Sequence, residues 1–117
     1  MIDIFEKFKA IISGYEVLLW ESEPNSYRFK AKLILTDGSQ LIVRDYLFPS
    51  GRKYSFHWKD KNNNLLIRWD NSLHWITIET FPHHKHDKKN VLPSQDVTLE
   101  DVLNFICENI KPNGVRS

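Results

Sequence analysis

The chain has 117 residues, of which 41% are hydrophobic, 13% aromatic and 26% charged, and its formal net charge is +1. This length suits one compact domain, which we expect over residues 1–117. The composition excludes a disordered or low-complexity protein, because it supplies enough apolar surface to offset the entropy lost on folding. No apolar run approaches the ~20 residues of a membrane-spanning helix, and the N-terminus lacks the features of a signal peptide. We therefore expect a cytoplasmic protein that has no contact with a membrane.

Residues 3–13 carry apolar side chains at helical spacing, with Asp3 as the expected N-cap and Gly14 just past the end. From residue 15 to residue 80 the period changes to two, which indicates an antiparallel meander. The strongest hairpin signal is Asp37-Gly38, which suits a type I′ turn. The predicted strands span residues 15–23, 27–36, 39–48, 53–59, 65–70 and 74–80.

Residues 81–96 have no periodicity, contain Pro82 and Pro93, and form an unusually long connection, so we expect a histidine-rich functional loop there. Thr98 and Asp101 have the spacing of a capping box. A closing helix is then predicted from the apolar residues Leu99, Val102, Leu103, Ile106 and Ile110. The single cysteine, Cys107, is expected in its core, which excludes a disulfide or a thiolate zinc site. Residues 111–117 are expected to be a flexible tail.

These elements predict an α+β fold. We expect a single domain with a twisted antiparallel sheet of about six strands, and with an N-terminal and a C-terminal helix packed on one face of that sheet. The exposed edge at residues 15–23 would allow a second copy of the chain to pair with it, so a homodimer is one expectation.

The side chains suited to chemistry are concentrated between residues 57 and 86, which include all five histidines. Neighbouring hairpins would bring these segments together. Strand alternation predicts that His57 shares a polar face with Ser55, opposite Phe56 and Trp58. It also predicts that Arg68 and Asp70 share a face opposite Trp69. The candidate catalytic residues are His57, Arg68, Asp70, His74, His83, His84 and His86.

This set of residues suits cleavage of RNA without a metal ion. One histidine can remove the proton of the 2′-hydroxyl group, a second can protonate the leaving 5′-oxygen, and an arginine can stabilise the transition state. Tryptophans such as Trp75 would stack on unpaired bases, although half-buried tryptophans in a small sheet are more often core residues. The candidate substrate-binding residues are Trp58, Trp69, Asn71, Lys85 and Lys88.

A metal site is the competing interpretation. His84 and His86 would lie on one face of an extended segment, and Asp70 or His74 would complete the ligand set. Because the spacing is also that of an anion site rich in histidine and lysine, we expect neither a metal nor another cofactor. None of the standard glycine-rich phosphate loops occurs in the sequence.

Two motifs carry a resemblance to a known family. They are Arg68-Trp69-Asp70-Asn71 and the stretch Phe81-Pro82-His83-His84-Lys85-His86. With Tyr54-Ser55-Phe56-His57-Trp58, the residues from Leu33 to Ser39 and the C-terminal capping segment, the chain resembles the TumE family of small toxins over nearly its full length. One departure is that the family commonly has a pair of histidines after Asp-Asn, whereas this chain has His74-Trp75.

The resemblance implies a prokaryotic growth inhibitor whose partner is a DNA-binding antitoxin. The residues that match the family motifs are His57, Arg68, Asp70, Asn71, His74, His83, His84, Lys85 and His86.

Three functions remain open. The first is a metal-independent endoribonuclease toxin with an RNA substrate, the second is a binding module without enzymatic activity, and the third is a metal-dependent nuclease or another phosphoryl-transfer enzyme.

Overall fold

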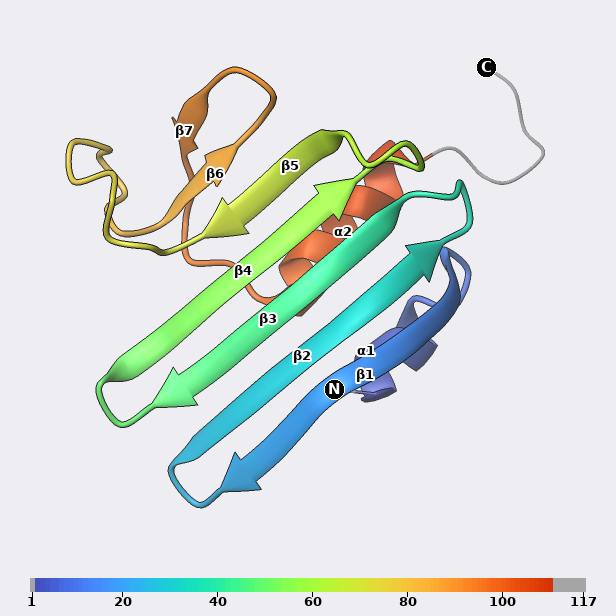
Figure 1. The fold of residues 1–117 in the computed structure, drawn as a ribbon, viewed down its shortest axis with the longest axis horizontal. Helices are drawn as coiled ribbons and strands as arrows, with labels where there is room; N and C mark the ends of the chain where they lie inside the picture. Colours follow the sequence, from blue (N-terminus) through green and yellow to red (C-terminus); the bar gives the residue numbers. More distant parts are fainter. Residues whose placement is uncertain (1, 111–117) are drawn as a thin grey trace.

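In the part of the chain that the structure describes, seven strands follow one another across one antiparallel sheet in the order β1 to β7, with one helix before them and one after them (Figure 1). The computed structural model describes residues 2–110. The elements are α1 (Ile2–Lys7), β1 (Ile12–Glu23), β2 (Ser26–Leu35), β3 (Gln40–Phe48), β4 (Gly51–Lys59), β5 (Leu65–Asp70), β6 (His84–His86), β7 (Val91–Pro93) and α2 (Leu99–Asn109). This is the α+β meander that the sequence predicts, with one strand more than expected.

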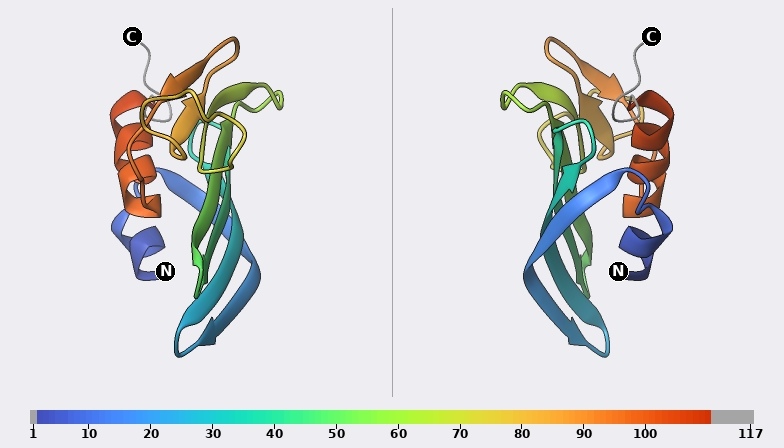
Figure 2. Two further views of the ribbon diagram at one scale, coloured as in Figure 1. Left: turned by 90° about the vertical axis from the view of Figure 1, so that its left-hand side faces the viewer. Right: turned by 90° about the vertical axis from the view of Figure 1, so that its right-hand side faces the viewer.

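Both helices cover the same face of the sheet, and no helix within residues 2–110 covers the opposite face of the long strands (Figure 2). The strands alternate accordingly, so that every second residue of β2, β3 and β4 is buried under the helices. The largest fully buried side chains of this core include Phe29 and Phe56 from the sheet and Leu103 and Ile106 from α2. The polar side chains at the intervening positions therefore lie on the helix-free face.

Helix α2 begins as the sequence predicts. Thr98 accepts a hydrogen bond from the Asp101 backbone N–H, and the Asp101 carboxylate accepts one from the Thr98 N–H, so the capping box is complete. The predicted apolar stripe of the helix is buried. Cys107 lies off this stripe and is exposed, so its predicted burial in the core is wrong.

Helix α1 is shorter than predicted, because the chain leaves the helix after Lys7 and enters β1 at Ile12. The Ile11 carbonyl accepts a hydrogen bond of 2.9 Å from the N–H of Thr36, which draws this segment toward β2. Asp3 is therefore inside the first turn rather than at the N-cap, and Gly14 lies in a strand.

The hairpin at Asp37-Gly38 is confirmed, but the expected type I′ turn is wrong. Among the described residues of this turn only Gly38 has a positive φ, of 88°. The Gly38 N–H donates to the Leu35 carbonyl, and the Leu35 N–H donates to the Ser39 carbonyl. This pattern is that of a three-residue loop with glycine in the left-handed region. Such loops are the next most common hairpin connections after two-residue turns.

The predicted strand at residues 74–80 is absent, and the predicted loop at residues 81–96 contains two short strands. Residues 74–83 instead form consecutive turns, in which the N–H groups of Ile78, Phe81 and His83 each donate to a carbonyl three residues earlier. The edge of β5 that a strand at residues 74–80 would have taken pairs with β6. Three-residue strands carry too little alternation to be recognised in a sequence.

No helix in residues 2–110 is long and apolar enough to cross a membrane. Strand β1 forms one edge of the sheet. Tyr15, Leu18 and Trp20 in this strand are exposed. Pairing of two copies along this edge stays a prediction.

Candidate functional site

Two rows of residues that pair across β4, β5 and β6 bring polar side chains together on the helix-free face of the sheet. In one row His57 pairs with Arg68, and Arg68 pairs with His86. In the next row Asp70 pairs with His84. Phe56 and Trp58 flank His57 on β4, and Trp69 lies between Arg68 and Asp70 on β5. These three residues are buried on the helix side, as the alternation predicts.

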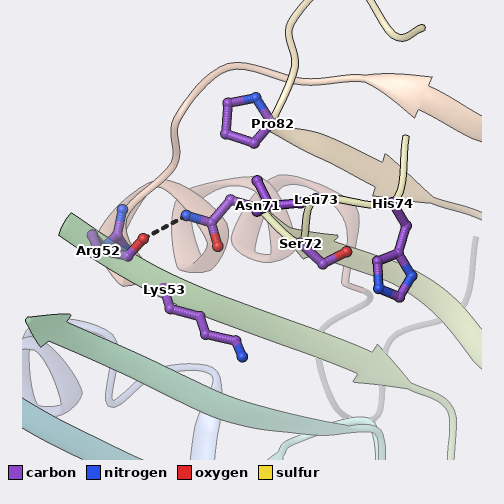
Figure 3. A pocket seen from close by; sticks show the side chains of 7 residues that line it. All are labelled: Arg52, Lys53, Asn71, Ser72, Leu73, His74 and Pro82. Carbon is purple, nitrogen blue, oxygen red and sulfur yellow. Dashed lines mark hydrogen bonds between the residues drawn. The ribbon is translucent and has the colours of Figure 1, made fainter. Parts of the chain in front are cut away.

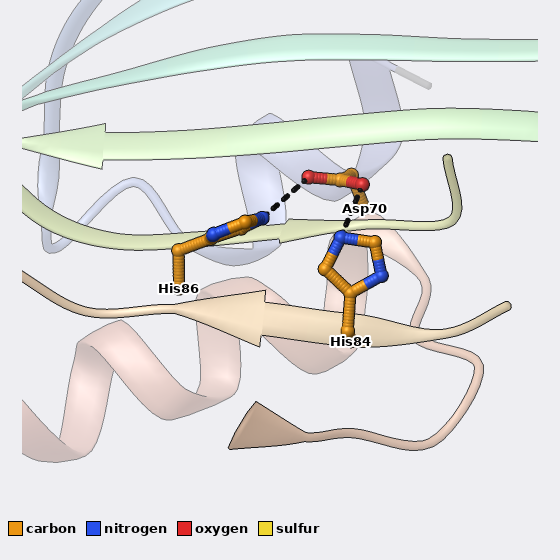
Figure 4. Close-up of side chains that lie close together, drawn as sticks. All are labelled: Asp70, His84 and His86. Atoms are coloured by element: carbon orange, nitrogen blue, oxygen red, sulfur yellow. Dashed lines mark ion pairs between the residues drawn. The ribbon is translucent and has the colours of Figure 1, made fainter. Parts of the chain in front are cut away.

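The carboxylate of Asp70 is the centre of this cluster, and it is buried. Its Oδ1 accepts a hydrogen bond of 3.0 Å from the Ser72 N–H, and its Oδ2 accepts one of 3.0 Å from Arg68 Nε. The Nε2 atoms of His84 and His86 lie 2.8 Å from Oδ1 and 3.4 Å from Oδ2, respectively (Figure 4). Strands β5 and β6 therefore supply one connected group of ionisable side chains, and the turn after β5 adds a backbone N–H.

The pKa values of Asp70 and His57 reflect opposite balances of burial and charge. Burial by itself raises the pKa of Asp70, but hydrogen bonds from Ser72 and Arg68 outweigh it, and the pKa is lowered. Burial lowers the pKa of His57, and the neighbouring cations Arg68 and Lys59 lower it further. Asp70 is therefore an anion at neutral pH, while His57 is biased toward its neutral form.

His84 is 1% exposed, and its two ring nitrogens have different surroundings. Nδ1 lies 2.9 Å from the Pro82 carbonyl oxygen. Because a carbonyl oxygen can only accept, Nδ1 carries a proton. Nε2 makes no hydrogen bond among residues 2–110, but it lies 2.8 Å from Asp70 Oδ1, a contact that becomes an ion pair when the ring is protonated.

His83 belongs to a different environment from His84, because successive residues point in different directions. Its Nδ1 lies 2.9 Å from the Tyr54 hydroxyl oxygen, and the two rings are stacked with centroids 5.9 Å apart. Tyr54 is on the buried side of β4, and burial raises its pKa to about 12. His83 is thus separated from the cluster around Asp70.

Two cavities border the cluster and have Lys53 and Ser72 in common. The smaller, of about 190 Å³, is also lined by Arg44, Arg68 and Asp70. The larger, of about 430 Å³, is lined by the labelled residues of Figure 3, which are Arg52, Lys53, Asn71, Ser72, Leu73, His74 and Pro82. His74 therefore reaches the site from the turn segment, although it does not lie on a strand.

Trp58 and Trp69 are packed in the core rather than displayed for base stacking. Both indoles meet the ring of Phe105 in α2 edge to face, with centroids 6.3 and 5.5 Å away. The Trp58 indole N–H donates a hydrogen bond of 3.1 Å to Ser39 Oγ. Because the two side chains are 7% and 5% exposed, they have no free face for a nucleotide. Trp75, in contrast, is exposed and lies against His86.

The other predicted substrate-binding residues are dispersed. Asn71 joins two strands, accepting from the Tyr54 N–H at 3.0 Å and donating to the Arg52 carbonyl at 2.7 Å (Figure 3). Lys85 pairs with Trp69 and therefore extends from the helix side of the sheet. Lys88 lies in the turn between β6 and β7, away from both cavities described above.

Arg44 and Lys53 are functional candidates that the sequence reasoning missed. Arg44 pairs with Ser55, and Lys53 lies two residues before Ser55, so both are on the face of His57. The signal was present, because both residues have the parity of the polar positions in their strands. It was overlooked because lysine and arginine at such positions are ordinary on a solvated face.

Asp70, His84 and His86 are the group in the described chain that could hold a metal ion, since their ligand atoms all lie within 4.8 Å of one another. His57 and His74 are outside this group. The site thus consists of a buried set of potential metal ligands beside two cavities with cationic walls.

The fold and site are those of a small α+β protein with a histidine-rich, cationic functional face. The chain belongs to the TumE toxin family, because the family model described as Toxin TumE matches residues 1–110. Membership of a toxin family implies a cognate antitoxin. A search of curated proteins and a search of solved structures each returned no match.

Proposed function

We propose that this protein is the toxin component of a type II toxin–antitoxin module and that it inhibits growth by cutting RNA. The observation that carries the proposal is the position of His57 opposite Arg68, which lines a cavity together with Arg44 and Lys53. A group able to exchange a proton thus lies opposite one cation, Arg68, and on the same face of the sheet as Arg44 and Lys53. This combination suits a phosphodiester. The antitoxin is proposed to be a DNA-binding protein that neutralises the toxin.

The proposed reaction starts from the 2′-hydroxyl group of the RNA. His57 accepts its proton, the oxygen attacks the adjacent phosphorus, and the bond from phosphorus to the 5′-oxygen breaks. His74, in its protonated form, donates a proton to the leaving 5′-oxygen. Arg44, Lys53 and Arg68 stabilise the additional negative charge of the transition state. The products are a 2′,3′-cyclic phosphate and a free 5′-hydroxyl group.

Electrostatics support this division of roles. Burial, together with the charges of Arg68 and Lys59, lowers the pKa of His57, so that more of the ring is neutral near pH 7 and able to accept a proton. His74 is exposed and lines the larger cavity next to Lys53. The two histidines come from different elements: His57 lies on β4 opposite Arg68, and His74 lies in the turn segment.

The remainder of the helix-free face supports a polymeric anion as substrate. Lys30 of β2 pairs with Arg44 of β3, and Lys32 pairs with Ile42, so cationic side chains continue across the sheet from the smaller cavity. The whole chain has a net charge of only +1, so this face is basic by local arrangement. Such a row suits a phosphate backbone extending beyond the cleaved bond.

A second candidate is metal-dependent hydrolysis of a phosphodiester, which the convergence of Asp70, His84 and His86 favours. A metal-activated water would leave a 5′-phosphate or a 3′-phosphate on the product without a cyclic intermediate. The chemistry of the product ends therefore separates the two candidates without any use of a chelator.

The test is incubation of the purified protein with total cellular RNA and with a short oligoribonucleotide, followed by analysis of the product ends. We expect 2′,3′-cyclic phosphates, and a fall in rate of at least about 100-fold for His57→Gln. Lys53→Ala should slow RNA cleavage. The control is Lys9→Ala, at an exposed position between α1 and β1, and it should leave the cleavage rate unaltered.

Three outcomes would contradict the proposal. Ends formed by direct hydrolysis would favour the metal-dependent candidate. RNA binding by the folded protein without cleavage would indicate a binding module. Growth arrest with neither binding nor cleavage of RNA would indicate a different target.

A further inference from the structure

Three potential metal ligands converge where β5 and β6 pair. Asp70 is the last residue of β5, and His84 and His86 are the first and last residues of β6 (Figure 4). All three side chains extend from one face, because His84 pairs with Asp70 and His86 lies two residues further along the strand. We propose that Asp70, His84 and His86 bind one divalent transition-metal ion, most suitably zinc. This inference does not depend on the proposed ribonuclease activity.

The donor atoms fit this class of ion. Two imidazole nitrogens and one carboxylate oxygen are typical ligands of zinc and of other first-row transition metals, whereas magnesium and calcium prefer oxygen ligands. Zinc bonds of about 2.0–2.2 Å with tetrahedral angles put the donor atoms about 3.3–3.6 Å apart. The contact of 3.4 Å between His86 Nε2 and Asp70 Oδ2 has this separation, and the contact of 2.8 Å between His84 Nε2 and Asp70 Oδ1 is shorter. All the ligand atoms lie within 4.8 Å of one another, so the side chains need to adjust when the ion binds.

The orientation of His84 is the strongest argument. Its Nδ1–H donates to the Pro82 carbonyl, so the remaining nitrogen, Nε2, is directed at Asp70. Metal-bound histidines commonly donate their other N–H to a backbone carbonyl in this way, which fixes both the tautomer and the ring. Within residues 2–110, the buried Nε2 atoms of His84 and His86 make no hydrogen bond, and both face the Asp70 carboxylate. A bound cation would satisfy both nitrogens at once.

The other two ligands, Asp70 and His86, are also preorganised. The Ser72 N–H and Arg68 Nε each donate to one oxygen of Asp70, which orients the carboxylate toward the histidines. The indole of Trp75 lies edge to face against His86, with centroids 6.1 Å apart. Three protein ligands leave a position for water or for a substrate oxygen.

The proposed ion would also stabilise the end of the sheet formed by β5, β6 and β7. Strands β6 and β7 have three residues each, so few backbone hydrogen bonds hold β6 to β5 and β7 to β6. A metal ion joined to both β5 and β6 adds a link between them. Binding should therefore raise the melting temperature, because the ligand sites converge only in the folded chain.

The test is titration of the full chain with zinc, after removal of metal with a chelator and exchange into chelator-free buffer. Calorimetry should give one zinc ion per chain, and cobalt substitution should produce visible absorption bands typical of nitrogen and oxygen ligands. Zinc, but not magnesium, should raise the melting temperature. His86→Ala and Asp70→Asn should weaken zinc binding by at least about 100-fold, whereas His57→Ala, a histidine outside the set, should bind zinc as the unchanged protein does.

His84→Ala is the less useful variant, because His84 is buried and its loss could unfold this part of the sheet. His86 is partly exposed, so His86→Ala keeps the test interpretable if its circular dichroism spectrum is unchanged. The inference is overturned if the folded protein binds no zinc, or if His86→Ala binds it with unchanged stoichiometry and affinity. A nitrogen-15 NMR spectrum in which zinc leaves the signals of His84 unaltered would overturn it as well.

Discussion

Arg68 and His57 lie directly opposite each other on the paired strands β5 and β4. Burial lowers the pKa of His57, and the positive charges of Arg68 and Lys59 act in the same direction because they disfavour the imidazolium form. This pairing links a group that can bind a phosphate to a group that can accept a proton. The effect of Arg68 on the pKa of His57 can also be measured without any substrate.

We expect Arg68→Met to raise the pKa of His57 toward its ordinary value, because the substitution removes a neighbouring cation and keeps most of the side-chain volume. The pKa is measured by following the His57 ring signals in an NMR titration. Lys85→Met is the matched control, since Lys85 extends from the opposite side of the sheet, and it should leave the pKa unaltered. An unaltered pKa in Arg68→Met would remove Arg68 as a cause.

The same pKa shift predicts how stability changes with pH. His57 takes up a proton less readily in the folded than in the unfolded chain, where its ordinary value is 6.5. The unfolded state therefore binds more protons below that pH, and this histidine contributes to a fall in the free energy of unfolding as the pH decreases through about 6.5. Urea denaturation of the protein and of His57→Gln at several pH values measures this contribution. It is contradicted if the two dependences on pH are parallel.

The buried carboxylate of Asp45 is paired with Arg52 at two points, with Nε donating at 2.9 Å and Nη2 at 3.2 Å. Arg52 Nη1 also donates to the Val97 carbonyl, which joins the segment just before α2 to β4. We expect Arg52→Met to reduce the free energy of unfolding by about 3–5 kcal/mol, since a buried charge loses its partner. Denaturant unfolding measures this loss.

A double variant tests the origin of the Arg52 effect. Arg52→Met combined with Asp45→Asn should lose less free energy of unfolding than the two single variants lose in total, because no uncompensated buried charge remains. Additive losses would mean that Arg52 contributes through packing on Tyr54, whose ring centroid lies 4.4 Å from the guanidinium carbon, and not through the ion pair.

Asn71 holds β4 where β5 ends, using both polar atoms of its side-chain amide. Asn71→Asp keeps the acceptor for the Tyr54 N–H but replaces the donor to the Arg52 carbonyl with a second oxygen. We expect a loss of about 1–3 kcal/mol in the free energy of unfolding, because a backbone acceptor loses its partner beside a new charge. Asn104→Asp, on the exposed side of α2, is the control for the same chemical change. Equal losses in both variants would contradict the role given to Asn71.

The capping box of α2 should contribute independently of the functional site. Thr98→Ala removes the acceptor for the Asp101 N–H and should cost about 1 kcal/mol. Thr98→Ser retains the hydroxyl group and should remain close to the unchanged protein. Thermal or urea denaturation of the two variants gives the comparison, and a Thr98→Ser variant as unstable as Thr98→Ala would point to the methyl group instead.

Local sequence determined the parts of this protein that depend on residues close together in the chain. The period of two in β4 and β5 predicted which face carries His57, Arg68 and Asp70, because alternation is a property of any extended strand. Thr98 and Asp101 predicted the start of α2 for a similar reason, since both hydrogen bonds of the cap join residues three apart.

Only the tertiary structure decided which histidines lie close together. His83 and His84 are adjacent in sequence, yet His83 lies against Tyr54 and His84 is directed at Asp70. The difference arises because β6 takes the free edge of β5, and that pairing joins residues fourteen or more positions apart. Residues 74–80 alternate as a strand would, but they are excluded from the sheet by the same pairing. Periodicity reports the preference of a segment, whereas the available partner determines whether a strand forms and what its side chains meet.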